Sequence, residues 1–428
     1  MPERKINVDY ISRVEGQGGI DLYVTRDGEL RDAKVRIFEP PRFFEAFMVG
    51  RKYDELMELA ARICGICPVS HEISALRAVE DALGVEVSEA TKRVRKLMAM
   101  SALISSHVLS VYFLTLPDYF GGRDLIEVAG QNPGLLKRGL ELKRLGNDLT
   151  ELIGGRSVHP VTAIVGGFTN SISKGDADAI RKRFIEAKSD ALKTVHLFKG
   201  LEMPKFTRKC EHMAISSSEE YAINEGQLAS TEGIKVPQRE YRRLVKENQV
   251  QHSNAKHSNV KGRTSYLVGP LARVNINFDQ LSPDARRAAK SAGLNVPNYS
   301  PFKSPLARAV EVVHCIDECI EILETMPYGE EASPIKLRAG DGYAITEAPR
   351  GINYHHYSLN RNGITTRADI VPPTCQNYRN MEMDLMELVP PILDLQDDEI
   401  AHKCQMLIRT YDPCISCSVH AIKIHRIK

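Results

Sequence analysis

The chain has 428 residues and a nearly balanced charge, with 57 Lys and Arg residues against 55 Asp and Glu residues. This balance argues against a chain built mainly to bind nucleic acid or an anionic membrane surface. Nine cysteines are too few for a disulfide scaffold at this length, and they fit a reducing compartment. We find no secretory signal and no apolar run of about eighteen residues, and therefore expect a cytoplasmic protein without direct membrane insertion.

The first predicted elements are a β-hairpin and two helices. Alternating apolar residues on either side of Arg26-Asp27-Gly28 predict a hairpin over about 19–38. Helical spacing follows from Phe43 to Gly50, and a second helix over 72–83 is expected to end at Gly84.

Longer helical patterns dominate the remainder of the chain. They begin with a run capped by Ser88 that reaches Tyr112, and continue over roughly 134–153, 176–198, 305–325 and 378–410. Irregular segments are expected at 154–167 and 347–357. The sequence therefore predicts a mainly α fold with a minor β part (α+β), in which long central helices hold metal-bearing loops. No linker or repeat divides it, so residues 1–428 are expected to form a single body.

Two Cys-x-x-Cys pairs, each with a trailing histidine, lie near opposite ends of the chain. They are Cys64 and Cys67 with His71, and Cys414 and Cys417 with His420. One such pair alone could be a redox dithiol, half of a zinc site or chance. Two pairs favour a shared centre of zinc, iron–sulfur or nickel with iron. Their wide separation argues against a small zinc ribbon.

The cysteine motifs resemble the two signatures of the large, catalytic subunit of nickel–iron hydrogenases. These are Arg-Ile-Cys-Gly-Ile-Cys at 62–67 and Asp-Pro-Cys-x-x-Cys-x-x-His at 412–420. Shorter elements follow in that family's order at 12–16, 42–45, 155–160, 268–273, 347–351 and 371–374. The resemblance covers nearly the whole chain. It implies that family's fold and reversible heterolytic cleavage of dihydrogen to protons and electrons.

The resemblance also implies a division of labour among the cysteines. Cys64 and Cys414 would be terminal ligands of nickel, whereas Cys67 and Cys417 would bridge nickel to an iron carrying cyanide and carbon monoxide. A terminal sulfur keeps a lone pair that can accept a proton. Glu15 would carry that proton onward, although a lone glutamate is otherwise most often a solvated surface charge.

Further residues are implied around the metals. Arg350 would lie over the open metal face, paired with the carboxylates of Asp118 and Asp412. Thr374 would donate a hydrogen bond to a cyanide, and Pro349 would form an apolar wall beside the iron. An arginine in this sequence context could otherwise be an ordinary surface or helix-start residue.

Two roles are implied for residues outside this set. His71 would donate a hydrogen bond to a bridging sulfur, unless it simply packs on its own loop. Glu45, the carbonyl of Ile370 and His420 would hold a separate Mg²⁺ or similar divalent ion near the C-terminus. A glutamate on an aromatic-rich helix is more commonly just its polar face.

Several partners follow from the same resemblance. The 412–420 motif and the 116–119 segment look most like the cytosolic, multi-subunit branch. Its members pair with a small iron–sulfur subunit, together with further electron-transfer subunits linked to flavin and NAD(P), a deazaflavin or heterodisulfide reductase. Residues 421–428 would be a peptide removed by a maturation protease. The alternatives are a hydrogen sensor and a non-catalytic coupling subunit.

Other candidate residues are interpreted as structural. Cys315 and Cys319 share a helical face and are expected to be ordinary buried thiols. His252, Lys256 and His257 are expected on a basic loop that could contact a partner, although a solvated face is the more common case.

Overall fold

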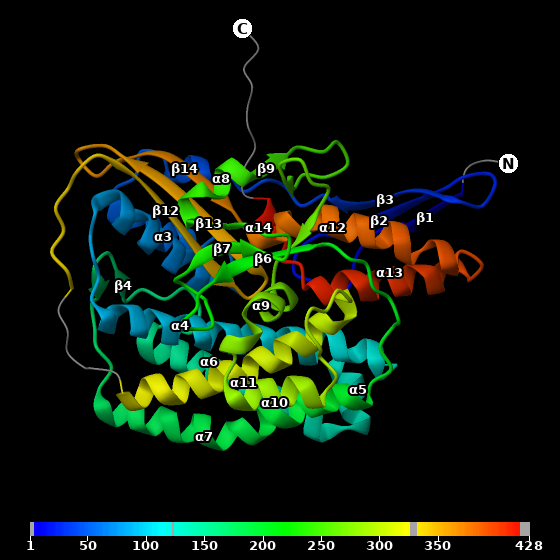
Figure 1. The fold of residues 1–428 in the computed structure, drawn as a ribbon, viewed down its shortest axis with the longest axis horizontal. Coiled ribbons are helices and arrows are strands. Elements are labelled where there is room, and N and C mark those ends of the chain that lie inside the picture. The colour runs from blue at the N-terminus through cyan, green and yellow to red at the C-terminus, as the bar shows by residue number, and fades with distance from the viewer. Residues whose placement is uncertain (1–3, 122–123, 326–331, 420–428) are drawn as a thin grey trace, which may run out of the picture.

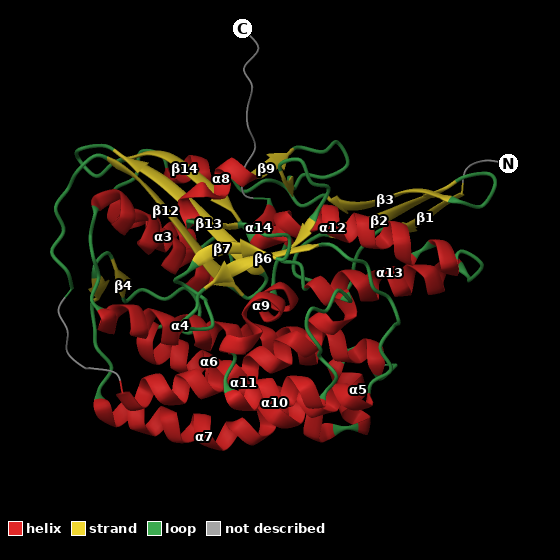
Figure 2. Ribbon diagram, viewed as in Figure 1, coloured by secondary structure: helices red, strands yellow, loops and turns green. Residues whose placement is uncertain are grey.

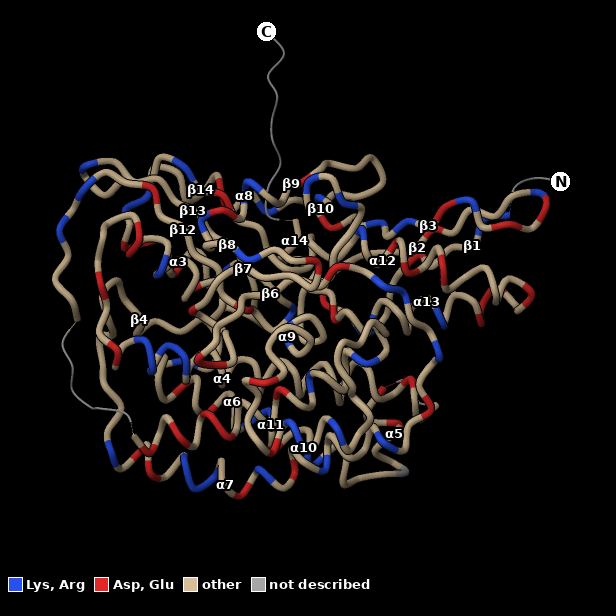
Figure 3. Tube along the Cα trace, viewed as in Figure 1, with Lys and Arg blue, Asp and Glu red and all other residues tan. Residues whose placement is uncertain are grey.

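The computed structural model describes residues 4–121, 124–325 and 332–419. Most long helices lie together in one half of the molecule, and the β-sheets lie in the other half (Figures 1 and 2). Acidic and basic residues both occur along the outer helix α7 (Figure 3), as the balanced composition implies.

The helical half is built mainly from five of the described helices. They are α4 (Glu89–Val108), α6 (Pro133–Gly154), α7 (Lys174–Leu197), α10 (Pro283–Ser291) and α11 (Ser304–Thr325). Helix α4 packs on α6 and α11, and α7 packs on α6 and α11. The hydroxyl of Ser88 accepts the backbone N–H of Thr91 at 3.0 Å, which confirms the predicted cap of α4. The four long patterns predicted up to residue 325 are thus confirmed as helices.

Helix α4 does not end cleanly. It continues as a π-helical stretch, Leu109–Thr115, and a 3₁₀ turn, Leu116–Tyr119. Within the described residues, the combined stretch Glu89–Tyr119 is long and apolar enough to cross a bilayer by length and composition alone, a test that a buried core helix also passes. The fold buries 78% of its most apolar window, so packing in the core accounts for its composition.

The N-terminal sheet contains the predicted hairpin and one further strand. Strands β1 (Arg4–Val8), β2 (Gly18–Val24) and β3 (Leu30–Ile37) are antiparallel neighbours in that order. The hairpin is confirmed, and β1 adds an edge strand that the sequence pattern did not predict. Helices α12 (Pro373–Leu388) and α13 (Asp397–Tyr411) contact this sheet through β3 and β1, respectively.

A second antiparallel sheet corrects the prediction of an irregular segment at 347–357. Strands β12 (Gly340–Ala348), β13 (Gly351–Leu359) and β14 (Thr365–Val371) pair in sequence order. Nearly every residue of β13 is buried, so the strand lacks the alternation that marks a half-exposed strand. Pro349 and Arg350 form the two-residue connection between β12 and β13.

Helix α3 (Pro68–Leu83) packs against β12 and β13. The approach is so close that a Cβ atom at Gly342 would lie 1.8 Å from the carbonyl oxygen of Ala78. Only glycine fits there. Helix α3 starts before the predicted residue 72 and ends as predicted, with Gly84 in the left-handed region at φ 64°.

The pattern over 378–410 is two helices and not one. Pro390 and Pro391 separate α12 from α13, because proline cannot continue the helical hydrogen bonding. The remaining described helices are α1 (Phe44–Met48), α2 (Leu56–Ala61), α5 (Leu125–Gln131), α8 (Tyr241–Leu244), α9 (Pro270–Asn277) and α14 (Ile415–Ser418). The remaining strands are β4 (Ala163–Ile164), β5 (Gly167–Phe168), β6 (Glu211–Ser216), β7 (Gln227–Ser230), β8 (Lys235–Val236), β9 (Val245–Asn248), β10 (His257–Val260) and β11 (Tyr266–Leu267).

Candidate metal centre

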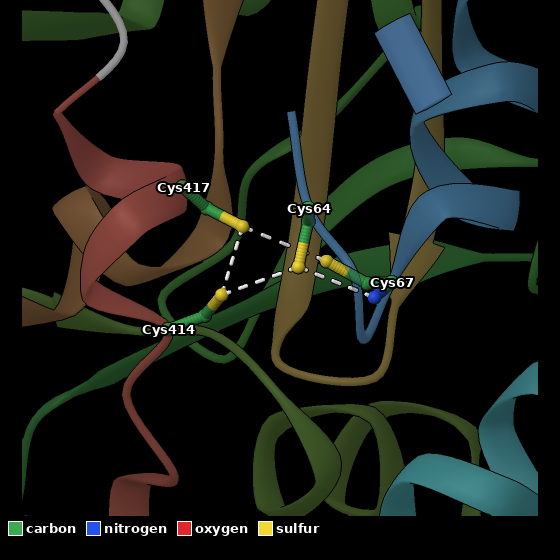
Figure 4. A group of neighbouring side chains, drawn as sticks. All are labelled: Cys64, Cys67, Cys414 and Cys417. Carbon is green, nitrogen blue, oxygen red and sulfur yellow. Dashed lines mark hydrogen bonds between the residues drawn. The ribbon is translucent and has the colours of Figure 1, made fainter. Parts of the chain in front are cut away.

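The two cysteine pairs meet although 350 positions separate them. Cys64 and Cys67 lie between α2 and α3, and Cys414 and Cys417 lie at and within α14 (Figure 4). The sulfur of Cys64 is 3.4 Å from that of Cys414, and the sulfur of Cys67 is 3.7 Å from that of Cys417. All four sulfurs lie within 4.8 Å of one another. The predicted shared site is therefore geometrically formed.

The cysteine site is enclosed by protein, and each of its four residues is at most 4% exposed. The pKa of Cys67 is lowered by hydrogen bonds from the thiols of Cys414, Cys417 and Cys64. The pKa of Cys417 is raised by burial and by its contact with Cys414. Protein alone thus stabilises one thiolate at the expense of its neighbours. A metal ion removes this conflict, because it holds every coordinating cysteine as a thiolate.

Glu15 contacts the C-terminal cysteine pair directly. The thiol of Cys414 donates to Glu15 Oε2 at 3.1 Å, and the backbone N–H of Ser416 donates to the same oxygen at 3.1 Å. The backbone is joined as well, since the N–H of Ile415 donates to the carbonyl of Glu15 at 3.0 Å. A Cβ at the next residue, Gly16, would lie 2.6 Å from the Ile415 side chain. Glycine therefore allows the two segments to meet.

Arg350 is buried at the tip of the β12–β13 hairpin and is paired with Asp412. Its Nε donates to the Asp412 carbonyl at 2.6 Å, and its Nη2 donates to the Asp412 carboxylate at 3.0 Å. Burial opposes the charge, but Asp412 and the nearby cysteine sulfurs raise the pKa of Arg350 well above its usual range. Arg350 is therefore a fixed cation beside the cysteines.

Asp118 does not form the predicted pair with Arg350. Its carboxylate binds Arg409, with Nε and Nη2 at 2.7 and 2.8 Å, and it also binds Arg13. The three contacts of Arg350 go to Asp412 and Ser106 instead. Arg13 lies two residues before Glu15, so Asp118 anchors the segment that carries Glu15.

Thr374 contacts the backbone of Cys414, whereas His71 lies buried near Cys67 but does not hydrogen-bond to it. The hydroxyl of Thr374 accepts the backbone N–H of Cys414 at 3.0 Å. His71 is fully buried, and its Nδ1 lies 3.1 Å from Nε2 of His355. Its Nε2 has no protein hydrogen-bond partner within the part of the chain that is described. His71 is nonetheless among the groups that lower the pKa of Cys67.

A buried cluster of ion pairs around Arg273 holds the β12–β13 hairpin in place. Arg273 donates to the carbonyls of Ala348 and Pro349 at 2.8 and 3.2 Å, which fixes the residues just before Arg350. It is paired with Glu311 at 2.6 Å and Glu347 at 3.0 Å. Arg273 belongs to the 268–273 motif of the sequence, but no role was predicted for it. Membership of that motif was the only indication in the sequence that this residue has a function.

The structure tests only part of the predicted magnesium site. The carboxylate of Glu45 accepts the backbone N–H of Ile370 at 2.8 Å, so these two residues are neighbours. His420 and the predicted peptide 421–428 lie outside the described residues.

The prediction of buried thiols on a helix is confirmed, whereas the prediction of a solvated loop is wrong. Cys315 and Cys319 are fully buried on α11, and burial raises the pKa of both thiols. The expectation of a solvated loop is wrong for His257, which is 4% exposed at the start of β10, and His252 is only partly exposed. Both histidines face Glu382 of α12.

The amino-acid sequence matches one protein family and several characterised relatives. The model of the family described as "Nickel-dependent hydrogenase" matches residues 42–133 and 202–420. The alpha subunit of sulfhydrogenase 1 from Pyrococcus furiosus is 32% identical over 424 residues, which is 98% of each chain. The F420-non-reducing hydrogenase of Methanothermobacter thermautotrophicus contains a chain that is 28% identical, with coverage of 98% of this chain and 95% of its own.

Solved structures show the same likeness. A crystal structure of an NAD⁺-reducing [NiFe]-hydrogenase in the H₂-reduced state superposes with a TM-score of 0.87 at 27% identity. The superposition covers 97% of this chain and 99% of that one.

Proposed function

The chain belongs to the nickel-dependent hydrogenase family, and on that premise we propose how its residues serve the reversible cleavage of dihydrogen. The observation that carries the proposal is the enclosed group of four cysteine sulfurs, with Glu15 in contact with one of them. A nickel–iron centre held by these cysteines would supply the heterolytic cleavage of dihydrogen and accept its electrons. The iron is proposed to carry cyanide and carbon monoxide.

The cysteines are proposed to divide between terminal and bridging roles. Cys64 and Cys414 would bind nickel alone, and Cys67 and Cys417 would join the two metals. One contact and one electrostatic effect support this division. Cys414 is the cysteine whose sulfur touches Glu15, so a proton accepted there has a carrier. His71 is among the groups that lower the pKa of Cys67, and its unpartnered Nε2 leaves it a donor for a bridging sulfur.

Glu15 is proposed to take the proton from the Cys414 sulfur. The two atoms are 3.1 Å apart, within reach for direct transfer. The N–H and hydroxyl of Ser416 hold the carboxylate in place. Glu15 is only partly buried, so it can pass the proton toward the protein surface.

Arg350, Thr374 and Pro349 are proposed to hold the iron's small ligands. The bond to Asp412 orients the Arg350 guanidinium, which can donate to a cyanide nitrogen. Thr374 accepts the Cys414 N–H, and its own hydroxyl proton remains to donate. Pro349 adds no donor on that side. Asp118, through Arg13, is proposed to position Glu15.

A second ion is proposed at Glu45, the Ile370 carbonyl and His420. The Glu45 carboxylate and the Ile370 backbone are already adjacent, and oxygen ligands of this kind suit Mg²⁺. The residues 421–428 that follow His420 are proposed to be removed by a maturation protease.

The protein is proposed to act as a single catalytic body in the cytoplasm, with a small iron–sulfur subunit. Its relatives are named as subunits of larger hydrogenases. Their names, which include F420-non-reducing and NAD⁺-reducing enzymes, motivate further electron-transfer partners linked to flavin and NAD(P), a deazaflavin or heterodisulfide reductase. A sensing or non-catalytic role is not favoured, since these relatives are hydrogenases.

Metal analysis of the purified complex tests the proposal. We expect nickel and iron in the large subunit, together with infrared bands of metal-bound carbon monoxide and cyanide. The proteins that copurify identify the electron acceptor. Zinc as the only metal at the cysteines, in a complex that cleaves dihydrogen, would contradict the nickel–iron assignment.

A further inference from the structure

A second group of ligand-type side chains lies outside the cysteine site. His252, His257 and Glu382 place one ligand atom each within 4.8 Å of the others. Nε2 of His252 is 2.7 Å from Oε1 of Glu382, and Nδ1 of His257 is 3.7 Å from Oε2. Each oxygen of one carboxylate thus faces a different imidazole.

The Glu382 carboxylate is held firmly in this position. The backbone N–H of Val35 donates to Oε1 at 3.3 Å, and Nη1 of Arg379 donates to Oε2 at 3.2 Å. The side chain of Glu382 is 3% exposed. A buried carboxylate oriented by neighbouring donors is preorganised to act as a ligand.

His257 provides a second, independent observation. It is 4% exposed, its ring stacks on Tyr378 with centroids 5.5 Å apart, and its Nε2 is buried without a partner. Its Nδ1 lies too far from Glu382 for a good hydrogen bond. The unpartnered Nε2 is the other ring nitrogen, so the atom of His257 that can bind an ion beside Glu382 is Nδ1, which makes no hydrogen bond within the described residues.

We propose that His252, His257 and Glu382 bind one divalent transition-metal ion. Two imidazoles and one carboxylate are a ligand set that zinc and ferrous iron use in proteins. The His252 side chain is 20% exposed, so water can reach this edge of the cluster and would be able to complete the ligand set. The proposal does not depend on the nickel–iron assignment.

The ion would stabilise the position of α12, which packs next to the cysteine site. Tyr378 of α12 stacks on His257 and shares a hydrogen bond of 2.7 Å with the Ser418 hydroxyl, next to Cys417. An ion at the three ligands would join β10 and the loop before it to α12, and so fix α12 against α14, which carries Cys417. The competing arrangement is an ion-free pair between protonated His252 and Glu382.

Titration of the purified complex with Zn²⁺, and with Co²⁺ as a coloured probe, separates the two arrangements. We expect one equivalent beyond the metals already bound, with visible Co²⁺ absorption of a low-coordinate site. His252→Ala should weaken this binding by at least about 10–100-fold, the range seen even for outer residues of metal sites. Nickel content should not change.

The matched control is His196→Ala, which removes an exposed histidine of α7 far from the cluster along the chain. It should bind Zn²⁺ like the wild type. If His257→Ala fails to fold, Glu382→Gln serves as the second ligand variant. Equal binding by all variants overturns the proposal, as does a wild-type complex that neither carries this ion after purification nor takes up an added equivalent.

Discussion

The Arg273 cluster and the cysteine site are both buried and both contain charge, yet only the first contains its own counter-charges. In the Arg273 cluster, Glu311 accepts from Arg273 at 2.6 and 2.8 Å and from Tyr221 at 2.6 Å. Its other neighbour is His107, at 2.8 Å. Arg273 also reaches Glu347 at 3.0 Å. Apart from Nδ1 of His107, which is buried without a partner in the described part of the chain, donors and acceptors are matched in this cluster.

In the cysteine site, four groups of the same kind face one another. The sulfurs of Cys414 and Cys417 lie 2.8 Å apart, and the nearest fixed cation, Arg350, is already paired with Asp412. Several negative charges can share a buried site only around a cation. The first cluster therefore holds the fold, whereas the second is arranged for a ligand that the protein does not itself supply.

The largest expected effect comes from removing one proposed metal ligand of the cysteine site. Cys414→Ser should abolish nickel retention and hydrogenase activity, because the nickel would lose one of its proposed terminal thiolates. The helical half should remain folded, as circular dichroism can show. The control is Cys404→Ser, a buried cysteine of α13 outside the site, which should keep its nickel.

Glu15→Gln should lower turnover by about 10²–10⁴-fold, the usual contribution of a positioned proton carrier. The amide can still accept from Ser416 but cannot carry the proton. Nickel content and the infrared bands should stay the same. Glu39→Gln is a matched control, because Glu39 lies in the same region and accepts the Gln17 N–H at 3.1 Å without touching Cys414. Equal loss in both variants would mean that Glu15 acts only in structure.

Glu311→Gln removes one charged partner from the Arg273 cluster. Removing one partner of a buried ion pair destabilises a fold by about 3–5 kcal/mol, so chemical denaturation should begin at clearly lower urea. Glu141→Gln breaks an exposed pair with Lys137 and should change stability by less than about 1 kcal/mol. If Glu311→Gln behaved like Glu141→Gln, the cluster would not hold the helical half.

Acid should weaken the helical half through its buried histidines. Burial lowers the pKa of His107 and His314 to about 4 from the usual 6.5. The unfolded chain therefore takes up protons first. Stability should be full above pH 6.5 and fall as the pH drops toward 4, by roughly 3 kcal/mol at most for each histidine.

Urea denaturation at several pH values measures this slope. His314→Gln should flatten it, because glutamine does not titrate. Glu347 acts in the opposite sense, since burial raises its pKa to about 7, and its contribution is lost as the pH rises from 4.5 to 7. The difference between wild type and variant removes that common term. An unchanged slope in His314→Gln would contradict the assignment.

The sequence predicted most helices and the meeting of the cysteines, because apolar periodicity and paired motifs are local signals. It missed β13, whose continuous burial hides the strand period. It also indicated the wrong partner for Asp118. Whether a carboxylate meets Arg350 or Arg409 depends on how distant segments pack, and motif order carries no information on that. His257 was misjudged for the same reason, since only β10 and α12 together enclose it.

The backbone bridge between Glu15 and the start of α14 has a consequence for biosynthesis. Glu15 and Cys414 are 399 positions apart, so a ribosome must release almost the whole chain before this edge of the site can form. Once it forms, the cysteines are sealed, and an ion could exchange with the surrounding solution only if the C-terminal segment detached. Metal ions must therefore reach the cysteines before the C-terminal segment folds over them. Afterwards, the rate at which this segment detaches, and not the affinity of the cysteines alone, determines how long the metal stays bound.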